Sequence, residues 1–308
     1  MNVGESSGTP EQTESNINRG RVKWLLRCPS YLILRGVLGP SNARTAAYCL
    51  NRRISSISSL TSAPLTEIER YLREASSSET LRELRRASDA LPWQGQFRAG
   101  PELYAILRTI QPEVMVETGV GSGYSTVHAL EAMRANGKGR LVSIDLPNAD
   151  PNWKLAKGAA TGYLVPAGLR DRWELRLGDT YQVLPALCRE LRSIDVFLHD
   201  SLHSYEAMSF EFQTAFNLCH PGSLLLADDA LWNSAILDFA GAIHEKVSLI
   251  YHTTGFAPIA GIYLHPNRVG RHDTESVRTA KYNSAAWNRA PSLVNSQAHA
   301  PTVSPRKP

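Results

Sequence analysis

Two acidic stretches mark the places where this chain is expected to do chemistry. Residues 199–203 read His-Asp-Ser-Leu-His and directly follow an apolar run, Ile194–Leu198; Asp228 and Asp229 directly follow another, Ser223–Ala227. The two runs are predicted as parallel strands, whose carboxyl ends lie at one edge of a sheet. Three carboxylates meeting there would repel each other unless one took up a proton or a hard cation such as Mg²⁺ lay between them.

These residue types suit the activation of a hydroxyl group. Asp200, Asp228 and Asp229 are the candidate metal ligands, and His203 is the candidate general base. A cation lowers the pKa of a coordinated hydroxyl, and a nearby imidazole can then remove the proton. The alternatives are structural: turn and helix-cap duty for the aspartates, and an ordinary hydrogen bond for His203. His199, at the same edge, is expected to support the base rather than replace it.

A glycine-rich turn indicates a second site. Val114–Tyr124 reads Val-Met-Val-Glu-Thr-Gly-Val-Gly-Ser-Gly-Tyr, which predicts a buried strand, a turn and the start of a helix that runs to Ala135. Glycines let the backbone approach a ligand closely, and a helix N-terminus offers unpaired N–H groups. Tyr124 occupies the third glycine position of a dinucleotide fingerprint, which disfavours a nicotinamide cofactor. A plain tight turn is the alternative.

Acidic residues also follow the next two predicted strands. Asp145 ends the strand Leu141–Asp145, and in a doubly wound sheet it lies beside the glycine turn, where it can accept hydrogen bonds from two ribose hydroxyls. Its alternative is a helix N-cap, although Pro147 follows and the next residues resemble a loop. Asp179 follows the strand Arg172–Leu177 in the same way.

The motifs together resemble a known family. The spacing Glu-x-Gly-x-Gly-x-Gly from Glu117 to Gly123 resembles motif I of the class I S-adenosylmethionine (SAM)-dependent methyltransferases. Phe197–Glu206 with Pro221–Asp229 resembles the metal-dependent group that includes the macrolide-sugar O-methyltransferases and the cephalosporin-hydroxylase-like proteins. The resemblance covers about residues 103–264.

The resemblance implies an α/β protein with a Rossmann-like class I methyltransferase fold: a seven-stranded, mostly parallel sheet with helices on both faces. It implies SAM as cofactor and Mg²⁺ as metal. The residues implied to bind the cofactor are Glu117, Gly119, Gly121, Gly123, Ser125, Asp145, Gly178, Asp179 and Asp200. The implied metal ligands are Asp200, Asp228 and Asp229, and the implied base is His203. The first acid of the pair is typically Glu in this group, so the shorter Asp228 is expected to contact the metal through water or not at all.

The function implied is a SAM-dependent, Mg²⁺-assisted O-methyltransferase. Its acceptor would be a hydroxyl of a small molecule such as a sugar or a natural-product glycoside. Two alternatives stay open: a metal-independent methyltransferase in which His203 acts alone, and a non-catalytic SAM-fold subunit for binding or assembly. The presence of Glu117, Asp145 and His203 disfavours the second alternative.

The composition limits the fold size, the class of partner and the cellular compartment that we expect. The chain has 308 residues, 43% of them hydrophobic, which suffices for one large α/β domain with additions. Its formal net charge of +4 is too small to indicate a nucleic-acid partner. Four scattered cysteines without a Cys-x-x-Cys pair favour reduced thiols in a cytoplasmic protein. We expect neither a secretion signal nor a membrane helix.

The chain divides into four predicted parts. Residues 1–20 are expected to be disordered, 21–100 to form a helical N-terminal extension, 101–266 the methyltransferase domain, and 267–308 a disordered basic tail. Residues 21–53 are basic and apolar; they would either pack on the domain or a second subunit, as in a homo-oligomer, or touch a membrane surface.

Further elements are predicted from local patterns. Thr66 and Glu69 form a capping-box pattern that predicts a helix over Thr66–Ala75. The other predicted elements are helices over 79–90, 101–110, 181–191, 205–218 and 232–245, a turn at 221–222, and an edge hairpin of strands at 247–252 and 259–264.

Overall fold

The computed structural model describes residues 53–89, 97–147, 159–251 and 258–266. The predicted disordered ends and the basic, apolar segment up to residue 52 lie outside the described residues, as do residues 148–158 between the second and third strands. Within the described part of the chain, no helix is long and apolar enough to cross a membrane.

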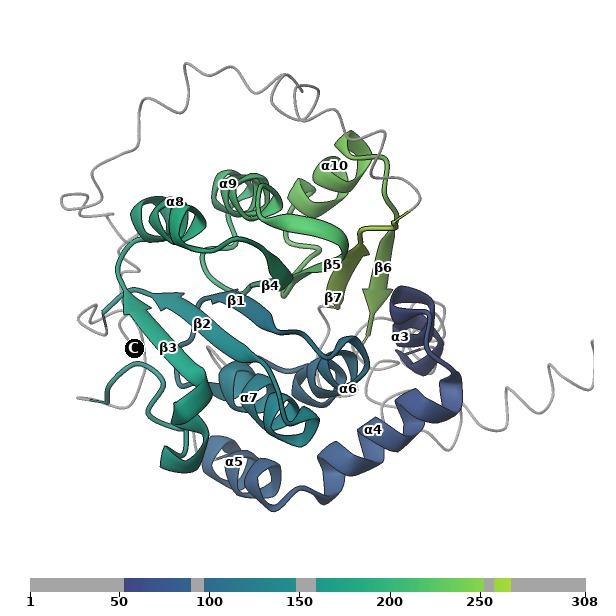
Figure 1. Cartoon of the computed structure of the whole chain (residues 1–308), viewed down its shortest axis with the longest axis vertical. Helices are drawn as coiled ribbons and strands as arrows, with labels where there is room; N and C mark the ends of the chain where they lie inside the picture. Colours follow the sequence, from purple (N-terminus) through teal and green to yellow (C-terminus); the bar gives the residue numbers. More distant parts are fainter. Residues whose placement is uncertain (1–52, 90–96, 148–158, 252–257, 267–308) are drawn as a thin grey trace, which may run out of the picture.

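One seven-stranded sheet forms the centre of the molecule, in the order β3-β2-β1-β4-β5-β7-β6 (Figure 1). The first five strands run parallel, and β7 runs antiparallel to both β5 and β6. The strands are β1 Val114–Thr118, β2 Arg140–Asp145, β3 Trp173–Leu177, β4 Ile194–His199, β5 Cys219–Ala227, β6 Val247–Ile250 and β7 Ile259–Tyr263. The chain reverses its direction of winding between β1 and β4, and such a switch point is where open α/β sheets bind their ligands.

Helices cover both faces of the sheet, as predicted. One face carries α8 (Thr180–Glu190), α9 (Tyr205–Phe216) and α10 (Ala235–Ala242). The other carries α6 (Gly100–Ile110), α7 (Tyr124–Asn136) and, against β6 and β7, α3 (Arg53–Thr61), with α4 (Leu65–Ser77) and α5 (Glu79–Asp89) beyond them (Figure 1). Successive side chains along each strand point to opposite faces of the sheet. Val116 and Phe197 pack toward α8–α10, and Met115 and Leu198 pack toward α6 and α7. The predicted α/β class is confirmed.

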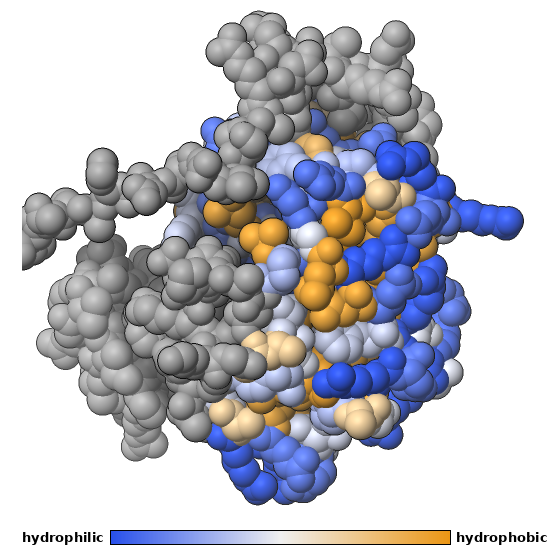
Figure 2. Space-filling view, turned by 90° about the vertical axis from the view of Figure 1, so that its left-hand side faces the viewer, coloured by the Kyte–Doolittle hydropathy of each residue, from blue (hydrophilic) through white to orange (hydrophobic). Residues whose placement is uncertain are grey.

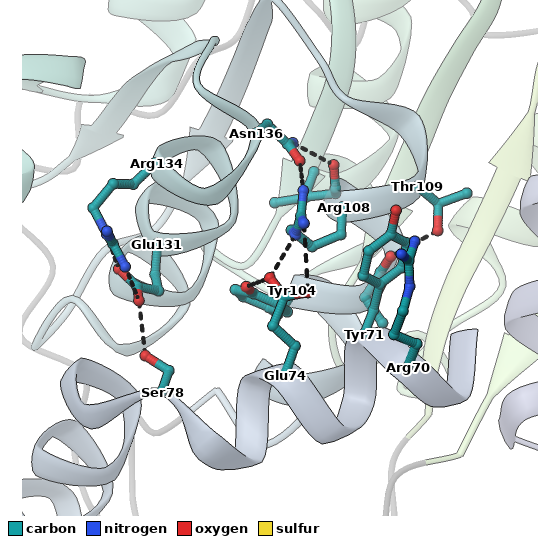
Figure 3. Close-up of polar contacts among 12 residues, drawn as sticks. Arg70, Tyr71, Glu74, Ser78, Tyr104, Arg108, Thr109, Glu131, Arg134 and Asn136 are labelled. Carbon is teal, nitrogen blue, oxygen red and sulfur yellow. Dashed lines mark hydrogen bonds and ion pairs between the residues drawn. The ribbon is translucent and has the colours of Figure 1, made fainter. Parts of the chain in front are cut away.

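A polar cluster fastens α4 to the helices that touch the sheet (Figure 3). Glu74 of α4 accepts hydrogen bonds from the Tyr104 hydroxyl at 2.6 Å and from Nε of Arg108 at 2.9 Å. Arg108 of α6 also donates to the side chain of Asn136, the last residue of α7. Three helices are thereby joined through one carboxylate and one guanidinium, which we call the balanced cluster: Glu74, Tyr104, Arg108 and Asn136.

The capping box predicted for α4 is wrong. The helix begins at Leu65, its N-cap is Pro64, and no side chain caps it. The Pro64 carbonyl accepts the N–H groups of Glu67 and Ile68 at 3.0 and 3.2 Å. Because the proline ring fixes an extended entry into the first turn, the helix starts before Thr66, which becomes its second residue.

Two further boundaries differ, one at the start of α10 and one at the start of β5. The helix predicted over 232–245 spans only Ala235–Ala242, because the Asn233 side chain accepts the N–H of Ala235 at 2.8 Å and starts it there. The turn predicted at 221–222 is a bulge inside β5, where Gly222 has φ +98°. The strand therefore begins earlier than the apolar run suggested.

Candidate active site

The glycine turn, residues 119–123, brings β1 against the end of β4. Gly119, Gly121 and Gly123 have φ of +83°, +53° and +97°, a region that side chains rarely adopt. A Cβ on Gly119 would lie 1.9 Å from the backbone oxygen of Asp200. Asp200 in turn donates its N–H to the Thr118 carbonyl at 2.8 Å. The predicted cofactor turn and the predicted first metal ligand are therefore in backbone contact.

The side chain of Glu117 supports the glycine turn through hydrogen bonds. Its side chain is fully buried and accepts hydrogen bonds from Ser125 at 2.5 Å, Thr126 at 2.8 Å and Ser143 at 2.7 Å. Burial raises the pKa of the Glu117 carboxyl, and the three hydroxyls act against that rise. These bonds give Glu117 and Ser125 a supporting role for the turn; their contact with a cofactor stays a prediction.

Asp145 lies beside the glycine turn, where the sequence predicted it. Its Oδ2 accepts the N–H groups of Val120 at 3.0 Å and Gly121 at 2.8 Å, and its Oδ1 accepts that of Leu146 at 2.7 Å. The carboxylate thus fixes the turn, and its oxygens have further lone pairs for donors such as ribose hydroxyls. Burial raises the pKa of Asp145, opposed by these backbone bonds.

The residues that follow β3 make structural hydrogen bonds. Asp179 is the N-cap of α8 and accepts the N–H of Tyr181 at 2.9 Å, while Gly178 donates its N–H to the Asp145 carbonyl at 2.8 Å. Leu146 and Leu177, which follow Asp145 and precede Gly178, are exposed. The face that carries the β3 edge shows apolar patches among hydrophilic residues (Figure 2). Contact of Gly178 and Asp179 with a cofactor stays a prediction.

Three carboxyl groups meet at the ends of β4 and β5, and we call them the acidic cluster: Asp200, Asp228 and Asp229. The two strands are joined there by a bond from the Asp228 N–H to the His199 carbonyl at 2.9 Å. The side chains of Asp200 and Asp228 are hydrogen-bonded to each other. Burial and the neighbouring Asp229 raise the pKa of Asp228 to about 7, and burial with the neighbouring Asp228 raises that of Asp200 well above its ordinary value. The two coupled carboxyls therefore keep a proton to higher pH than ordinary aspartates do.

The donor set of the acidic cluster fits a hard divalent cation, because two buried carboxyls that share a proton are groups whose repulsion a cation would relieve. As the side chains lie, no group of three Asp, Glu, His or Cys among the described residues could hold a metal ion. Asp229 has φ +45°, and its carbonyl accepts the Trp232 N–H at 3.0 Å. Strained backbone of this kind collects at functional sites.

His203 faces the acidic cluster. Its Nε2 lies 3.9 Å from Oδ1 of Asp200 and 3.6 Å from Oδ2 of Asp229, beyond hydrogen-bond distance. Burial, with a smaller effect from His199, lowers the pKa of His203 to about 4. The ring is therefore neutral at physiological pH and can accept a proton.

Behind His203 lies a buried acid that the sequence reasoning missed. His199 Nδ1 is 2.6 Å from Oε2 of Glu211, and His199 Nε2 is 3.3 Å from Nδ1 of His203. A signal existed: Met208, Glu211, Phe212 and Ala215 are all buried, and their spacing is that of the buried stripe of a helix. An acid on such a stripe requires a partner. The supporting role expected for His199 agrees with this contact.

Trp232 and Asn233 follow the acidic cluster in the chain and have different surroundings. The Trp232 side chain is 70% exposed, with its ring centroid 5.7 Å from that of His203. Asn233 donates to the His203 carbonyl at 3.1 Å and accepts the N–H of Ala235, the first residue of α10. Trp232 is thus available to a ligand beside His203, whereas Asn233 is occupied within the fold.

Comparison with known proteins locates this site within a recognised domain. Residues 116–230 match the family model described as a methyltransferase domain. A catechol O-methyltransferase from Niastella koreensis is 28% identical over 148 residues, which cover 48% of this chain and 60% of that relative. The match therefore spans less than two thirds of the relative's own length.

Solved structures show the same kind of likeness. An O-methyltransferase from Bacillus cereus, in complex with SAH, is 19% identical, with 64% of this chain and 99% of that chain covered and a TM-score of 0.47. An O-methyltransferase from Streptomyces achromogenes involved in tomaymycin synthesis, in complex with SAM, is 18% identical, with 64% and 96% covered and a TM-score of 0.46.

Proposed function

We propose that this chain, a class I SAM-dependent methyltransferase by its matched domain and its sheet, transfers a methyl group from SAM to a hydroxyl group of a small molecule. One observation carries the proposal. The imidazole of His203 faces the carboxyl groups of Asp200 and Asp229 at the switch point of the sheet, and Asp200 is in backbone contact with the glycine turn.

The chain's own residues account for the main requirements of the reaction. The glycine turn and Asp145 would bind the cofactor, and the acidic cluster favours the positive sulfonium over the neutral thioether product. His203 would take the hydroxyl proton on Nε2. The oxygen then forms a bond to the methyl carbon while the bond from carbon to sulfur breaks, leaving S-adenosylhomocysteine. Holding the two reactants in line supplies up to roughly 7–11 kcal/mol of the barrier.

The proposal also includes assistance of the methyl transfer by Mg²⁺. Asp200, Asp228 and Asp229 would be its ligands, with Asp228, the shorter acid, as the weakest. Bound there, Mg²⁺ would lower the pKa of the acceptor hydroxyl. A base whose pKa is about 4 is weak, so proton transfer to His203 from an ordinary alcohol would be strongly uphill without such help. This mismatch favours the metal-assisted route over methylation by His203 alone.

The acceptor is proposed only as a class. The sequence motifs point to a hydroxyl of a sugar or a natural-product glycoside, whereas the name of the curated relative points to a catechol. Both offer a hydroxyl with a neighbouring oxygen. A panel of glycosides and catechols, with S-adenosylhomocysteine formation as readout, would separate the two classes.

Calorimetric titration of SAM into the whole protein tests the proposal, first with EDTA and then with Mg²⁺. We expect micromolar binding of SAM in both, and a separate heat on adding Mg²⁺ that Asp200→Asn abolishes. Asp171→Asn, a change at an exposed carboxylate away from the site, is the matched control. SAM binding without a Mg²⁺ heat would leave a metal-independent methyltransferase. An absence of SAM binding would overturn the proposal and favour a non-catalytic assembly subunit.

A further inference from the structure

The edge of the sheet where β1–β5 end carries most of the large apolar side chains that the described residues expose. Five of the seven exposed ones end or closely follow a strand there, and we call them the apolar rim: Leu146 after β2, Leu177 at the end of β3, Leu202 after β4, and Leu231 and Trp232 after β5. We propose that this edge, together with the basic segment that precedes α3, binds the surface of an anionic lipid membrane.

The apolar rim indicates an interaction site. The exposed fractions of its side chains run from 48% for Leu146 to 70% for Trp232. Single apolar residues scattered over a surface are ordinary, whereas a group of them at one edge is typical of a surface that binds a partner. The neighbouring acidic cluster is largely covered, since the side chains of Asp200 and Asp229 are 18% and 28% exposed. It therefore presents little negative charge to a surface outside.

The start of α3 lies at the same edge of the sheet. Only three residues connect α6 to β1, so α6 runs antiparallel to β1 and its first turn lies where β1 ends. Packing agrees, because a Cβ on Gly100, the first residue of α6, would lie 2.3 Å from the ring of His128 near the start of α7. Arg53, which begins α3, lies 3.1 Å from the buried carboxylate of Glu102 in the first turn of α6. The chain that precedes α3 therefore joins the fold at the edge that carries the apolar rim.

The sequence before α3 has the charge that an anionic surface attracts. Residues 15–66 hold eight arginines and lysines and no aspartate or glutamate. The formal net charge of the whole chain is only +4, so the rest of the chain is net acidic and the positive charge is concentrated in this stretch. Between Arg21 and Leu38 the basic residues are interspersed with apolar ones, among them Trp24 and Leu26. Basic side chains are attracted to anionic headgroups, and tryptophan and leucine insert among the lipids.

The combination of charge and apolar rim favours a membrane over other partners. A nucleic acid offers phosphates to the basic segment but few apolar contacts to exposed leucines. A second copy of this chain would bring a segment of like charge to the same edge. A lipid bilayer offers anionic headgroups and hydrocarbon on one surface, which matches both features. Binding in this way would turn the candidate active site toward the membrane.

Sedimentation of the full-length protein with lipid vesicles tests the proposal, in EDTA so that no divalent cation bridges protein and lipid. The vesicles contain phosphatidylcholine alone, or phosphatidylcholine and phosphatidylglycerol at about two to one. We expect binding to the anionic vesicles that weakens as salt is added, and far weaker binding to the neutral ones. Equal binding to both, or none to the anionic vesicles, would overturn the proposal. Binding of duplex DNA without binding of vesicles would assign the basic segment to a nucleic acid instead.

Two sets of substitutions separate the charge from the apolar rim. Removing four basic residues should weaken binding to the anionic vesicles by more than about 100-fold, at roughly fivefold for each charge. Leu202→Asn with Leu231→Asn should weaken it by about tenfold, because both leucines are exposed and would contact the lipid. Full binding by either folded variant would contradict the proposal. The four changes of the first set are Arg21→Gln, Lys23→Gln, Arg27→Gln and Arg35→Gln.

The matched control removes the same number of charges from the exposed surface of α4 and α5, and it should bind the vesicles as the wild type does. An equal loss in the control would show that net charge alone governs binding, and the proposal would fail. Light scattering without vesicles checks the remaining alternative: a stable dimer that Leu202→Asn with Leu231→Asn dissociates would assign the apolar rim to a second copy of the chain. None of these measurements uses SAM or an acceptor, so failure of the proposed function would leave them unchanged. The control changes are Arg70→Gln, Arg73→Gln, Arg82→Gln and Arg86→Gln.

Discussion

Two polar clusters in this molecule differ in whether opposite charges are paired within them. The balanced cluster, between α4, α6 and α7, pairs the carboxylate of Glu74 with the guanidinium of Arg108 (Figure 3). Each charge lowers the energy of the other, so Arg108 helps to hold the pKa of Glu74 below its usual value although burial opposes it. The acidic cluster at the ends of β4 and β5 gathers three carboxyls. Arg98 offsets the rise in the pKa of Asp229 only in part, and the pKa of each carboxyl is raised overall.

The difference separates structural from functional polar residues. A cluster that only fastens helices gains from complete pairing, because every unpaired buried group costs free energy. A cluster with excess negative charge lowers the folding stability of the free protein. A bound cationic ligand offsets this loss of stability. The sulfonium of SAM and Mg²⁺ are both ligands of that kind. Three substitutions test this contrast.

The largest effect is expected at His203. His203→Ala should lower the rate of methyl transfer by about 10²- to 10⁴-fold, the usual contribution of a general base. Its affinity for SAM should stay nearly unchanged, because the proposed role of the ring is to take the proton of the acceptor hydroxyl and not to bind the cofactor. S-adenosylhomocysteine formation and calorimetry measure the two quantities. A large loss of SAM affinity would show that His203 belongs to the cofactor site instead.

A smaller effect is expected in the balanced cluster. Arg108→Met should lower the free energy of unfolding by about 2–3 kcal/mol, since Glu74 and Asn136 lose a charged partner in a half-buried site. Urea unfolding measures it, and Arg73→Met, which breaks an exposed pair with Glu69, should cost less than about 0.5 kcal/mol. Equal losses in the two variants would mean that the balanced cluster contributes no more than a surface ion pair.

The smallest effect, and one of opposite sign, is expected at Asp228. Its pKa in the folded protein, about 7, lies above the ordinary value of 3.8, so its contribution to stability is present below pH 3.8 and is lost as the pH rises through about 7. Asp228→Asn should therefore raise the free energy of unfolding by about 1–2 kcal/mol at mildly alkaline pH, because it removes a buried repulsion.

Thermal unfolding at several pH values follows this gain, which should shrink as the pH falls toward 4. Asp171→Asn serves again as the exposed control. An unchanged or lowered stability at alkaline pH would mean that the carboxylate of Asp228 is compensated in the folded protein, and the contrast between the two clusters would not hold.

Local sequence patterns predicted many residues of the candidate active site. The glycine turn could be predicted because glycine adopts positive φ angles such as those at residues 119, 121 and 123 without strain. Asp145 could be predicted because a strand end in a parallel sheet has a fixed neighbour. The meeting of Asp200 with Asp228 and Asp229 followed from the same rule. The start of α4 was misplaced, since the entry set by Pro64 decides the first turn more firmly than the pattern at Thr66.

The sequence by itself determined the α/β class, the seven strands and the edge of the sheet where the chemistry lies, because strand and helix periodicities and glycine turns are local properties of the chain. Only the tertiary structure decided which polar residues are paired. Glu211 is eight residues from His203 in the chain, but its link to His203 through His199 depends on how α9 packs against the end of β4. Hydrogen-bond partners, burial and the resulting pKa values arise from contacts between elements, and the spacing of residues along one element does not contain them.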